Sequence, residues 1–185
     1  MANTISQILK DYSVKYADNP VQYVKDKKGE FQPVSYKEFY TRTLTLAVAL
    51  SGLNIKQGSC VGVISENRGE WLLIDQALAA LRAANVPRGV DVTKGELEYI
   101  LGFAECETVF VENLTQLNKT ISIKETIPNV KNIILLDGEV KEVEGLNIYS
   151  FNEFFKRGEG KETDFVEALI DSGEKSDVAT IIFTS

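Results

Sequence analysis

The spacing of hydrophobic positions changes twice near the start of the chain. Apolar residues fall at helical spacing over residues 4–16, which predicts a helix. Short apolar runs at 21–25 and 31–34 then flank a polar stretch, and this arrangement indicates a β-hairpin. A longer helix begins after Ser35, whose hydroxyl suits the N-cap position, and Gly52 ends it. The first part of the chain is therefore predicted to form a helix, a hairpin and a second helix.

From residue 60 onward, short apolar runs alternate with amphipathic segments. The runs with the length and composition of buried strands are 60–64, 108–111, 132–136 and 178–183. Helical spacing predicts helices at 70–84, 93–104, 114–127, 151–155 and 164–171. A Pro-Arg-Gly sequence between Val86 and Val90 is too broken for a long central strand. Strands separated by helices imply parallel pairing, so the predicted fold class is α/β, a layered, mostly parallel sheet flanked by helices, with a small N-terminal hairpin.

Composition narrows the classes of function without choosing one. The chain has 185 residues and carries 20 Lys and Arg against 27 Asp and Glu, and this net charge of −7 argues against a nucleic-acid-binding module. It has no His, which removes the commonest general base and most zinc sites. Cys60 and Cys106 fit no metal-ligand spacing, so we expect buried thiols in a reducing compartment.

Two further features of the sequence concern the location of the protein in the cell. The N-terminus lacks the charged and apolar regions of a secretory signal. No stretch approaches the roughly 18 apolar residues of a transmembrane segment. We therefore expect a cytoplasmic protein without a transmembrane segment.

The glycine-rich stretch at 158–163 resembles a phosphate-binding loop only superficially. Phe155 stands where the first glycine of such a loop is required, and Lys161 is followed by Glu162 rather than by Ser or Thr. A solvated loop is the favoured interpretation. No Gly-x-Gly-x-x-Gly sequence follows any predicted strand, so a dinucleotide-binding fingerprint is absent as well.

The turn at 66–71 directly follows a predicted parallel strand, where ligand-binding loops usually lie. It has a structural interpretation too: Asn67 caps the next helix, Glu70 suits the first turn and Trp71 anchors the core. The structural interpretation is favoured.

Thr184 and Ser185 come after the predicted strand 178–183. Two hydroxyl side chains at the carboxyl end of a strand are well placed to begin a phosphate-binding turn. An interior strand is also an unusual place for a chain to end. We therefore expect an incompletely covered face there, and self-association through that truncated face.

Taken together, several segments resemble the N-terminal portion of AMP-forming acyl-CoA synthetases, members of the adenylate-forming superfamily, and especially its long-chain fatty acid–CoA ligase branch. The resemblance runs over 34–185, with motifs at 34–39, 52–58, 66–71, 86–91, 96–101 and 177–185. The turn at 66–71 is similar to the family's Asn-x-x-Glu-Trp turn. Residues 177–185 are similar to the strand that feeds its Ser-Gly-Thr-Thr-Gly-x-Pro-Lys-Gly loop. Arg82 departs from the pattern, because the family often has Gly there.

The resemblance implies a two-step reaction in a full-length enzyme that uses ATP, Mg²⁺ and CoA to convert a fatty acid to acyl-CoA, AMP and pyrophosphate. Thr184 and Ser185 match the first residues of the ATP phosphate loop, and no catalytic or metal-binding residue is carried over. Residues 1–34 would be an N-terminal helix and hairpin. Residues 35–185 would be an α/β subdomain of the AMP-binding domain, truncated at the start of the phosphate loop. Such a fragment is expected to be inactive alone and to hold no bound cofactor.

Two alternatives stay open at this point. The chain could come from another acid–CoA ligase, such as an aryl or medium-chain enzyme, because the acyl pocket of the family is set mainly by later residues. It could instead be a non-catalytic α/β binding or assembly module, since a fold does not carry a function. Whether the full-length enzyme associates peripherally with membranes is also left open.

Overall fold

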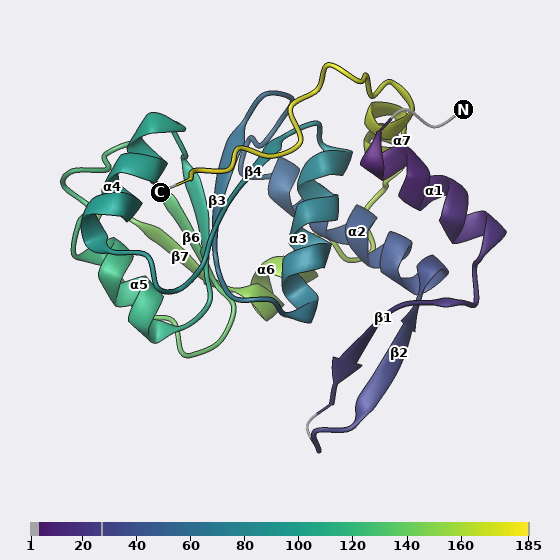
Figure 1. Ribbon diagram of the computed structural model, residues 1–185, viewed down its shortest axis with the longest axis horizontal. Helices are drawn as coiled ribbons and strands as arrows, with labels where there is room; N and C mark the ends of the chain where they lie inside the picture. Colours follow the sequence, from purple (N-terminus) through teal and green to yellow (C-terminus); the bar gives the residue numbers. More distant parts are fainter. Residues whose placement is uncertain (1–3, 27, 185) are drawn as a thin grey trace.

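Five parallel strands form the main sheet, and helices cover both of its faces (Figure 1). The computed structural model describes residues 4–26 and 28–184. Within these residues the strand order is β4-β3-β5-β6-β7, with all neighbouring strands parallel. The strands are β3 (Cys60–Ile64), β4 (Ala84–Arg88), β5 (Thr108–Val111), β6 (Asn132–Leu135) and β7 (Asn147–Ser150). The predicted α/β class with a parallel sheet is confirmed.

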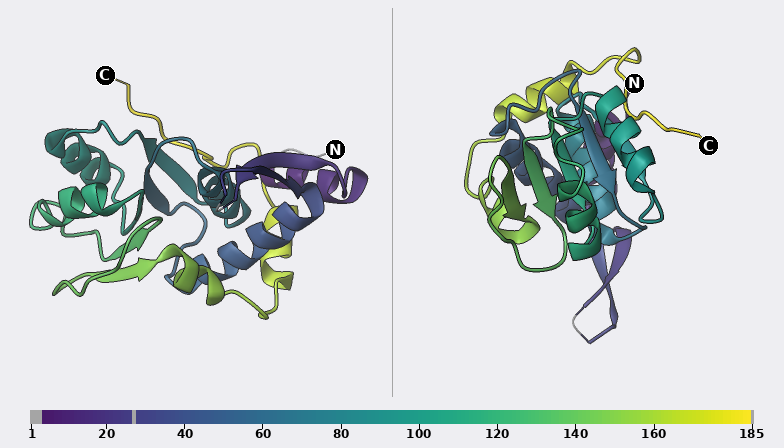
Figure 2. Two further views of the ribbon diagram at one scale, coloured as in Figure 1. Left: turned by 90° about the horizontal axis from the view of Figure 1, so that it is seen from below. Right: turned by 90° about the vertical axis from the view of Figure 1, so that its left-hand side faces the viewer.

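The helices lie in layers on the two sides of this sheet, as Figures 1 and 2 show. On one face are α2 (Tyr36–Ser51), α3 (Gly69–Ala80) and α6 (Phe151–Lys156), and on the other α4 (Lys94–Phe103) and α5 (Leu114–Ile121). Two further helices, α1 (Ile5–Lys15) and α7 (Asp164–Asp171), pack on the outside of α2 and α3. Both faces of the sheet are thus buried, which explains why its strands are nearly continuous apolar runs.

The N-terminal helix and hairpin form as predicted. The Thr4 hydroxyl caps α1 by accepting a hydrogen bond from the Gln7 N–H at 3.3 Å. The hairpin consists of β1 (Pro20–Lys25) and β2 (Phe31–Ser35), paired antiparallel. Figure 1 shows it projecting away from the layered body. Ser35 then caps α2 by accepting from the Glu38 N–H at 3.2 Å.

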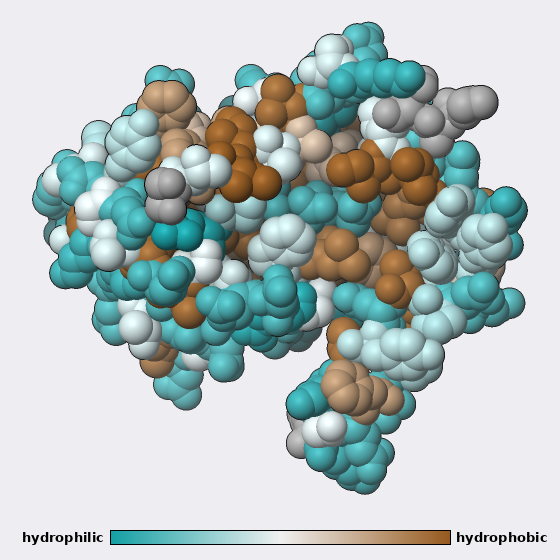
Figure 3. All heavy atoms as spheres, in the orientation of Figure 1, coloured by the Kyte–Doolittle hydropathy of each residue, from teal (hydrophilic) through white to brown (hydrophobic). Residues whose placement is uncertain are grey.

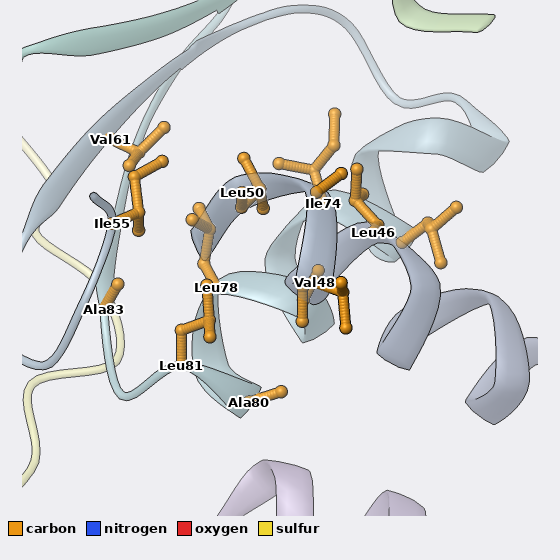
Figure 4. Close-up of a cluster of buried hydrophobic side chains, with 14 of the residues drawn as sticks. Leu46, Val48, Leu50, Ile55, Val61, Ile74, Leu78, Ala80, Leu81 and Ala83 are labelled. Carbon is orange, nitrogen blue, oxygen red and sulfur yellow. The ribbon is translucent and has the colours of Figure 1, made fainter. Parts of the chain in front are cut away.

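The larger core lies between α2, α3 and the sheet (Figure 4). Leu50 of α2 and Ile74 and Leu78 of α3 are completely buried. Full burial of one such side chain contributes about 1.5–3 kcal/mol. A second apolar cluster lies on the opposite face, between the sheet and α4 and α5. The sheet therefore separates two cores.

Two predicted helices end earlier than the hydrophobic pattern indicates. The helix predicted at 70–84 is α3, which ends at Ala80 because the backbone turns left-handed at Arg82, with a φ of 58°. The helix predicted at 114–127 is α5, which ends at Ile121 and is followed by hydrogen-bonded turns. In both places the apolar side chains beyond the helix still enter the core, so periodicity alone does not reveal the end.

The prediction of a buried strand at 178–183 is wrong. This segment runs beside β4, where the Asn85 N–H donates to the Ala179 carbonyl at 3.0 Å and the Ile181 N–H donates to the Asn85 carbonyl at 2.9 Å. The side chains of Val178 and Ile182 are 59% and 68% exposed. The segment has a neighbour on one side only, so one row of its side chains packs and the other faces solvent. Its partner β4 is a short edge strand, which accommodates Pro87.

The predicted solvated loop at 158–163 has one buried position. Gly158 lies against the backbone of α2, where an added Cβ atom would stand 2.0 Å from the Thr45 carbonyl oxygen. The neighbouring backbone cannot give way as a flexible side chain would. Gly158 is therefore a packing residue, and the glycine has no connection with phosphate binding.

Replacing Gly158 with Ala tests this packing. We expect Gly158→Ala to lower the free energy of unfolding by about 1–3 kcal/mol, because the methyl group forces the loop away from α2. Urea unfolding measures the change. The matched control is Gly102→Ala in α4, where nothing lies within 4 Å of the added methyl group. That substitution should stabilise the protein by about 0.5–1 kcal/mol through helix propensity. Equal effects at the two positions would contradict the packing argument.

Candidate functional site

The loops that follow β3, β4 and β5 meet at one edge of the sheet, because parallel strands direct their carboxyl ends the same way. An open cavity of about 280 Å³ lies at this edge. Its lining comes from the loops, from α3 and from the segment after Asp177. It includes Ser65, Glu66, Trp71, Arg88, Ile182 and Phe183. The cavity is our candidate functional site.

Carboxylate side chains connect these loops to one another through hydrogen bonds. The Glu112 carboxylate accepts hydrogen bonds from the Glu66 N–H at 2.7 Å and from the Ser65 hydroxyl at 3.1 Å. The Glu66 carboxylate accepts from the Val90 N–H at 3.2 Å, and the Lys119 ammonium donates to the Val90 carbonyl at 3.1 Å. Hydrogen bonds that involve a charged group are stronger than neutral ones. Hydrogen bonds within the chain therefore hold the loop framework beside the cavity.

A third carboxylate connects β4 to α4. The Glu96 carboxylate accepts from both the N–H and the hydroxyl of Thr93, each at 2.8 Å, and from the Arg88 guanidinium at 3.1 Å. These hydrogen bonds, the Thr93 N–H foremost, lower the pKa of Glu96 from its ordinary 4.5 to about 2. The Glu96 N–H donates in return to the Thr93 hydroxyl, which completes a capping box. Arg88 is thereby held at the cavity with its charge paired.

The turn at 66–71 departs from the predicted cap. Arg68, not Asn67, occupies the N-cap position of α3, and no side chain caps the helix there. The Arg68 guanidinium instead donates two hydrogen bonds, of 2.8 and 3.1 Å, to the Glu70 carboxylate. Burial is the largest influence on Glu70 and raises its pKa, but the hydrogen bonds from Arg68 and from the Glu70 backbone N–H, together with the charges of Arg68 and Arg42, leave the pKa lowered. The predictions for Glu70 in the first turn and for Trp71 against the core are confirmed.

Thr184 lies at the end of the segment that borders the cavity, and its side chain is exposed. The preceding Phe183 packs edge-on against Tyr99 and Phe103 of α4, with ring centroids 5.8 Å apart in each pair. This aromatic contact holds the segment against the α4 side of the sheet. Ser185 lies outside the described residues. The role of Thr184 and Ser185 in a phosphate loop stays a prediction.

The sequence reasoning missed Glu112 and Arg88 at this edge. Each lies at or directly after the carboxyl end of a strand, Arg88 as the last residue of β4 and Glu112 just after β5. Position after a parallel strand is the signal that could have found them, but in the sequence it singles out only the turn at 66–71 and the pair Thr184 and Ser185. The structure brings Glu66 and Trp71 to the same cavity as Ile182 and Phe183.

Other predicted groups lie away from this cavity. Cys60 is half-buried and Cys106 is buried, both as free thiols, and burial raises both pKa values, that of Cys106 to about 12. The described part of the chain has no group of three or more Cys, Asp or Glu side chains placed to hold a metal ion. None of the helices in that part is long and apolar enough to cross a bilayer.

Comparison with known proteins identifies the family. The family model for AMP-binding enzymes matches residues 10–185. The chain therefore belongs to the AMP-binding enzyme family, as the sequence motifs indicate. Within that family its relatives are AMP-forming acyl-CoA ligases.

The relatives include long-chain enzymes. Long chain acyl-CoA synthetase 4 of Arabidopsis thaliana is 30% identical over 185 residues, which cover 92% of this chain and 26% of that protein. Long-chain-fatty-acid–CoA ligase ACSBG2 of Xenopus laevis is 27% identical over 184 residues, which cover 98% of this chain and 24% of that protein. The chain thus spans about a quarter of the length of these relatives.

Solved structures share the fold. An anthranilate CoA ligase, AuaEII, in complex with anthranoyl-AMP matches with a TM-score of 0.72 and 23% identity, over 83% of this chain and 28% of that one. Coronafacic acid ligase from Pectobacterium brasiliense matches with a TM-score of 0.74 and 14% identity, over 97% of this chain and 33% of that one. The α/β arrangement of this chain is therefore the one found in these two ligases.

The low pKa of Glu96 gives a pH test of the edge of the site. A carboxyl whose pKa is lowered on folding stabilises the fold above its unfolded pKa and loses that contribution as protons bind. We expect the Glu96 contribution to be complete above about pH 4.5 and to disappear as the pH falls toward 2. A side-chain carboxyl NMR titration measures the pKa directly. Thr93→Ala removes the hydroxyl donor and should raise the pKa of Glu96. Titration of Glu96 near 4.5 in the unsubstituted protein would contradict the described hydrogen bonds.

Proposed function

We propose that this chain is part of a long-chain fatty acid–CoA ligase. The observation that carries the proposal is the match of residues 10–185 to the AMP-binding enzyme family, together with long-chain enzymes among the relatives. The cavity at the carboxyl ends of β3 and β4 supports it, because parallel sheets bind ligands at that edge.

The proposed reaction has two steps. A fatty acid carboxylate attacks the α-phosphate of ATP, a P–O bond breaks, and acyl-adenylate and pyrophosphate form. The thiol of CoA then attacks the acyl carbonyl, loses its proton and displaces AMP, which gives the thioester. Mg²⁺ bound with ATP supplies charge stabilisation in such chemistry. The described residues offer no three-ligand metal cluster, so we assign no Mg²⁺ ligand to them. Charge stabilisation by backbone N–H groups and lysine suits a chain without His.

In this proposal residues 35–185 are an α/β subdomain of the AMP-binding domain, and residues 1–34 are a separate helix and hairpin. Thr184 and Ser185 begin the loop that holds the ATP phosphates. The exposed hydroxyl of Thr184 and the cavity lined by Ile182 and Phe183 support that assignment. We further propose a cytoplasmic location for the protein.

We expect residues 1–185 alone to be inactive, because they span about a quarter of the related enzymes and a partial nucleotide site cannot orient ATP. The assay is AMP release with ATP, Mg²⁺, CoA and palmitate, and residues 1–185 should remain at background. If the gene encodes residues after 185, its whole product should release AMP only when ATP, Mg²⁺, CoA and palmitate are all present.

The choice of acid distinguishes the alternatives. Palmitate preferred over octanoate and benzoate supports the long-chain assignment, whereas preference for benzoate or octanoate assigns another acid–CoA ligase. A whole gene product that ignores ATP would favour a non-catalytic α/β module. AMP release by residues 1–185 alone would contradict the expected inactivity.

Self-association of the chain is also proposed. On the outer side of the 178–184 segment, the backbone groups of Thr180 and Ile182 have no hydrogen-bond partner among the described residues. Ile182 of this segment and Ile5 and Ile8 of α1 are exposed, and Figure 3 shows hydrophobic side chains gathered on this face of the molecule. An unpaired, uncharged edge of this kind is a template for strand pairing.

Sedimentation velocity over micromolar concentrations tests this proposal. We expect the average sedimentation coefficient to rise with concentration. Ile182→Lys places a charge on the outer row, so it should restore a monomer without loss of the folded state. Val14→Lys, at an 81% exposed position of α1, serves as the charge-matched control. A single monomeric species at every concentration would argue against self-association.

A further inference from the structure

The turn between α3 and β4 contains an arginine in an unfavourable backbone conformation. Arg82 has a φ of 58°, a left-handed conformation that glycine adopts more readily than other residues. The turn could therefore be made more easily by a residue without a side chain. An arginine at this unfavourable position indicates that its guanidinium group makes a stabilising contact.

That guanidinium binds a residue far along the chain. The Nε and Nη2 atoms of Arg82 donate to the two carboxylate oxygens of Asp177, each at 2.8 Å. The two side chains are only 12% and 16% exposed. Asp177 also accepts from the Glu174 N–H at 2.8 Å, which fixes its own turn, and from the Gln57 side chain at 3.4 Å. A two-pronged contact of this kind fixes orientation as well as distance.

The ion pair stands at the start of the segment that borders the cavity. Beyond Asp177 the chain makes two backbone hydrogen bonds with Asn85, and then Phe183 reaches the rings on α4. Figure 1 shows this last part of the chain crossing from the α7 side to the α4 side as an extended segment. The segment is held at its far end by aromatic packing and at its near end by Arg82.

We propose that Arg82 and Asp177 are positioning residues that carry the segment 178–184 to the carboxyl ends of β3 and β4. The inference rests on the proposed function, in which Thr184 begins the loop for the ATP phosphates. The ion pair sets where the segment leaves the α3 side of the sheet. The contacts of Asn85 and Phe183 then set its path past the cavity.

The positioning role requires an arginine at residue 82. Two substitutions distinguish a positioning residue from a residue that only makes the turn. Arg82→Gly relieves the left-handed backbone and removes the ion pair at the same time. If Arg82 only made the turn, Arg82→Gly would leave the segment 178–184 in place. Asp177→Asn keeps the size of the side chain and removes the charge. For a positioning pair, both substitutions release the segment while the sheet stays intact.

Two measurements on the 185-residue chain follow the segment. The first is hydrogen exchange at the Ile181 amide, which donates to the Asn85 carbonyl. We expect exchange to become about 10-fold to 100-fold faster in both variants, since bonds to charged groups oppose local opening. The second is fluorescence of Trp71, the single tryptophan of the chain, which lines the cavity beside Ile182. Its emission should move to longer wavelength as the segment withdraws.

The thermal midpoint and the exchange of the Val109 amide in β5 serve as global references, and both should stay close to the unsubstituted values. Lys10→Ala is the matched control, because it removes another long-range pair, Lys10 with Asp171 at 2.7 Å, which joins α1 to α7. It should leave Ile181 exchange and Trp71 emission unchanged.

Unchanged Ile181 exchange and Trp71 emission in both Arg82→Gly and Asp177→Asn would overturn the proposal. An equal acceleration at Ile181 and Val109 would overturn it too, since the pair would then stabilise the whole fold. Neither measurement involves acyl transfer. If Ile181 exchange and Trp71 emission stay unchanged while the whole gene product has ligase activity, only the positioning role is wrong. If both change as expected while the whole gene product has no ligase activity, only the proposed function is wrong.

Discussion

The direction of the strands in the main sheet determines where everything else lies. A parallel strand can follow another only after the chain has crossed back along the sheet, which here happens through α3, α4 and α5 between β3 and β6, and through the loop 136–146 between β6 and β7. The crossovers bury both faces and bring the carboxyl ends of β3, β4 and β5 to one edge. The cavity, the carboxylates beside it and the path of the last residues all depend on that common direction.

Charged groups at this edge are used mainly to hold backbone. Glu112 and Glu66 accept hydrogen bonds from neighbouring loops, and Glu96 fixes both the start of α4 and Arg88. Arg82 and Asp177 extend the same principle to the segment 178–184, which among the described residues makes two backbone hydrogen bonds with the sheet. A site assembled from several loops needs such fixed points, because loops without them have many conformations of similar energy.

Local patterns predicted most of the elements, because helix caps and buried strands leave their signals within a few neighbouring residues. Ser35 and the apolar run 60–64 are examples, and both behave as expected. The errors concern contacts between distant parts of the chain. The sequence does not show that Gly158 meets the backbone at Thr45, or that Arg82 ends a helix and binds Asp177. The same limit applies at the site, where the meeting of Glu66 with Glu112 depends on strand order.

The sheet also divides the apolar interior into two clusters, one against α2 and α3 and one against α4 and α5. Side chains that point to opposite faces of a strand, such as Val63 and Ile64 of β3, belong to different clusters and share no cluster neighbours. Substitutions in the two cores that lie more than about 10 Å apart should therefore act nearly independently on stability. One half of the interior can therefore be redesigned while the packing that supports the other half is kept.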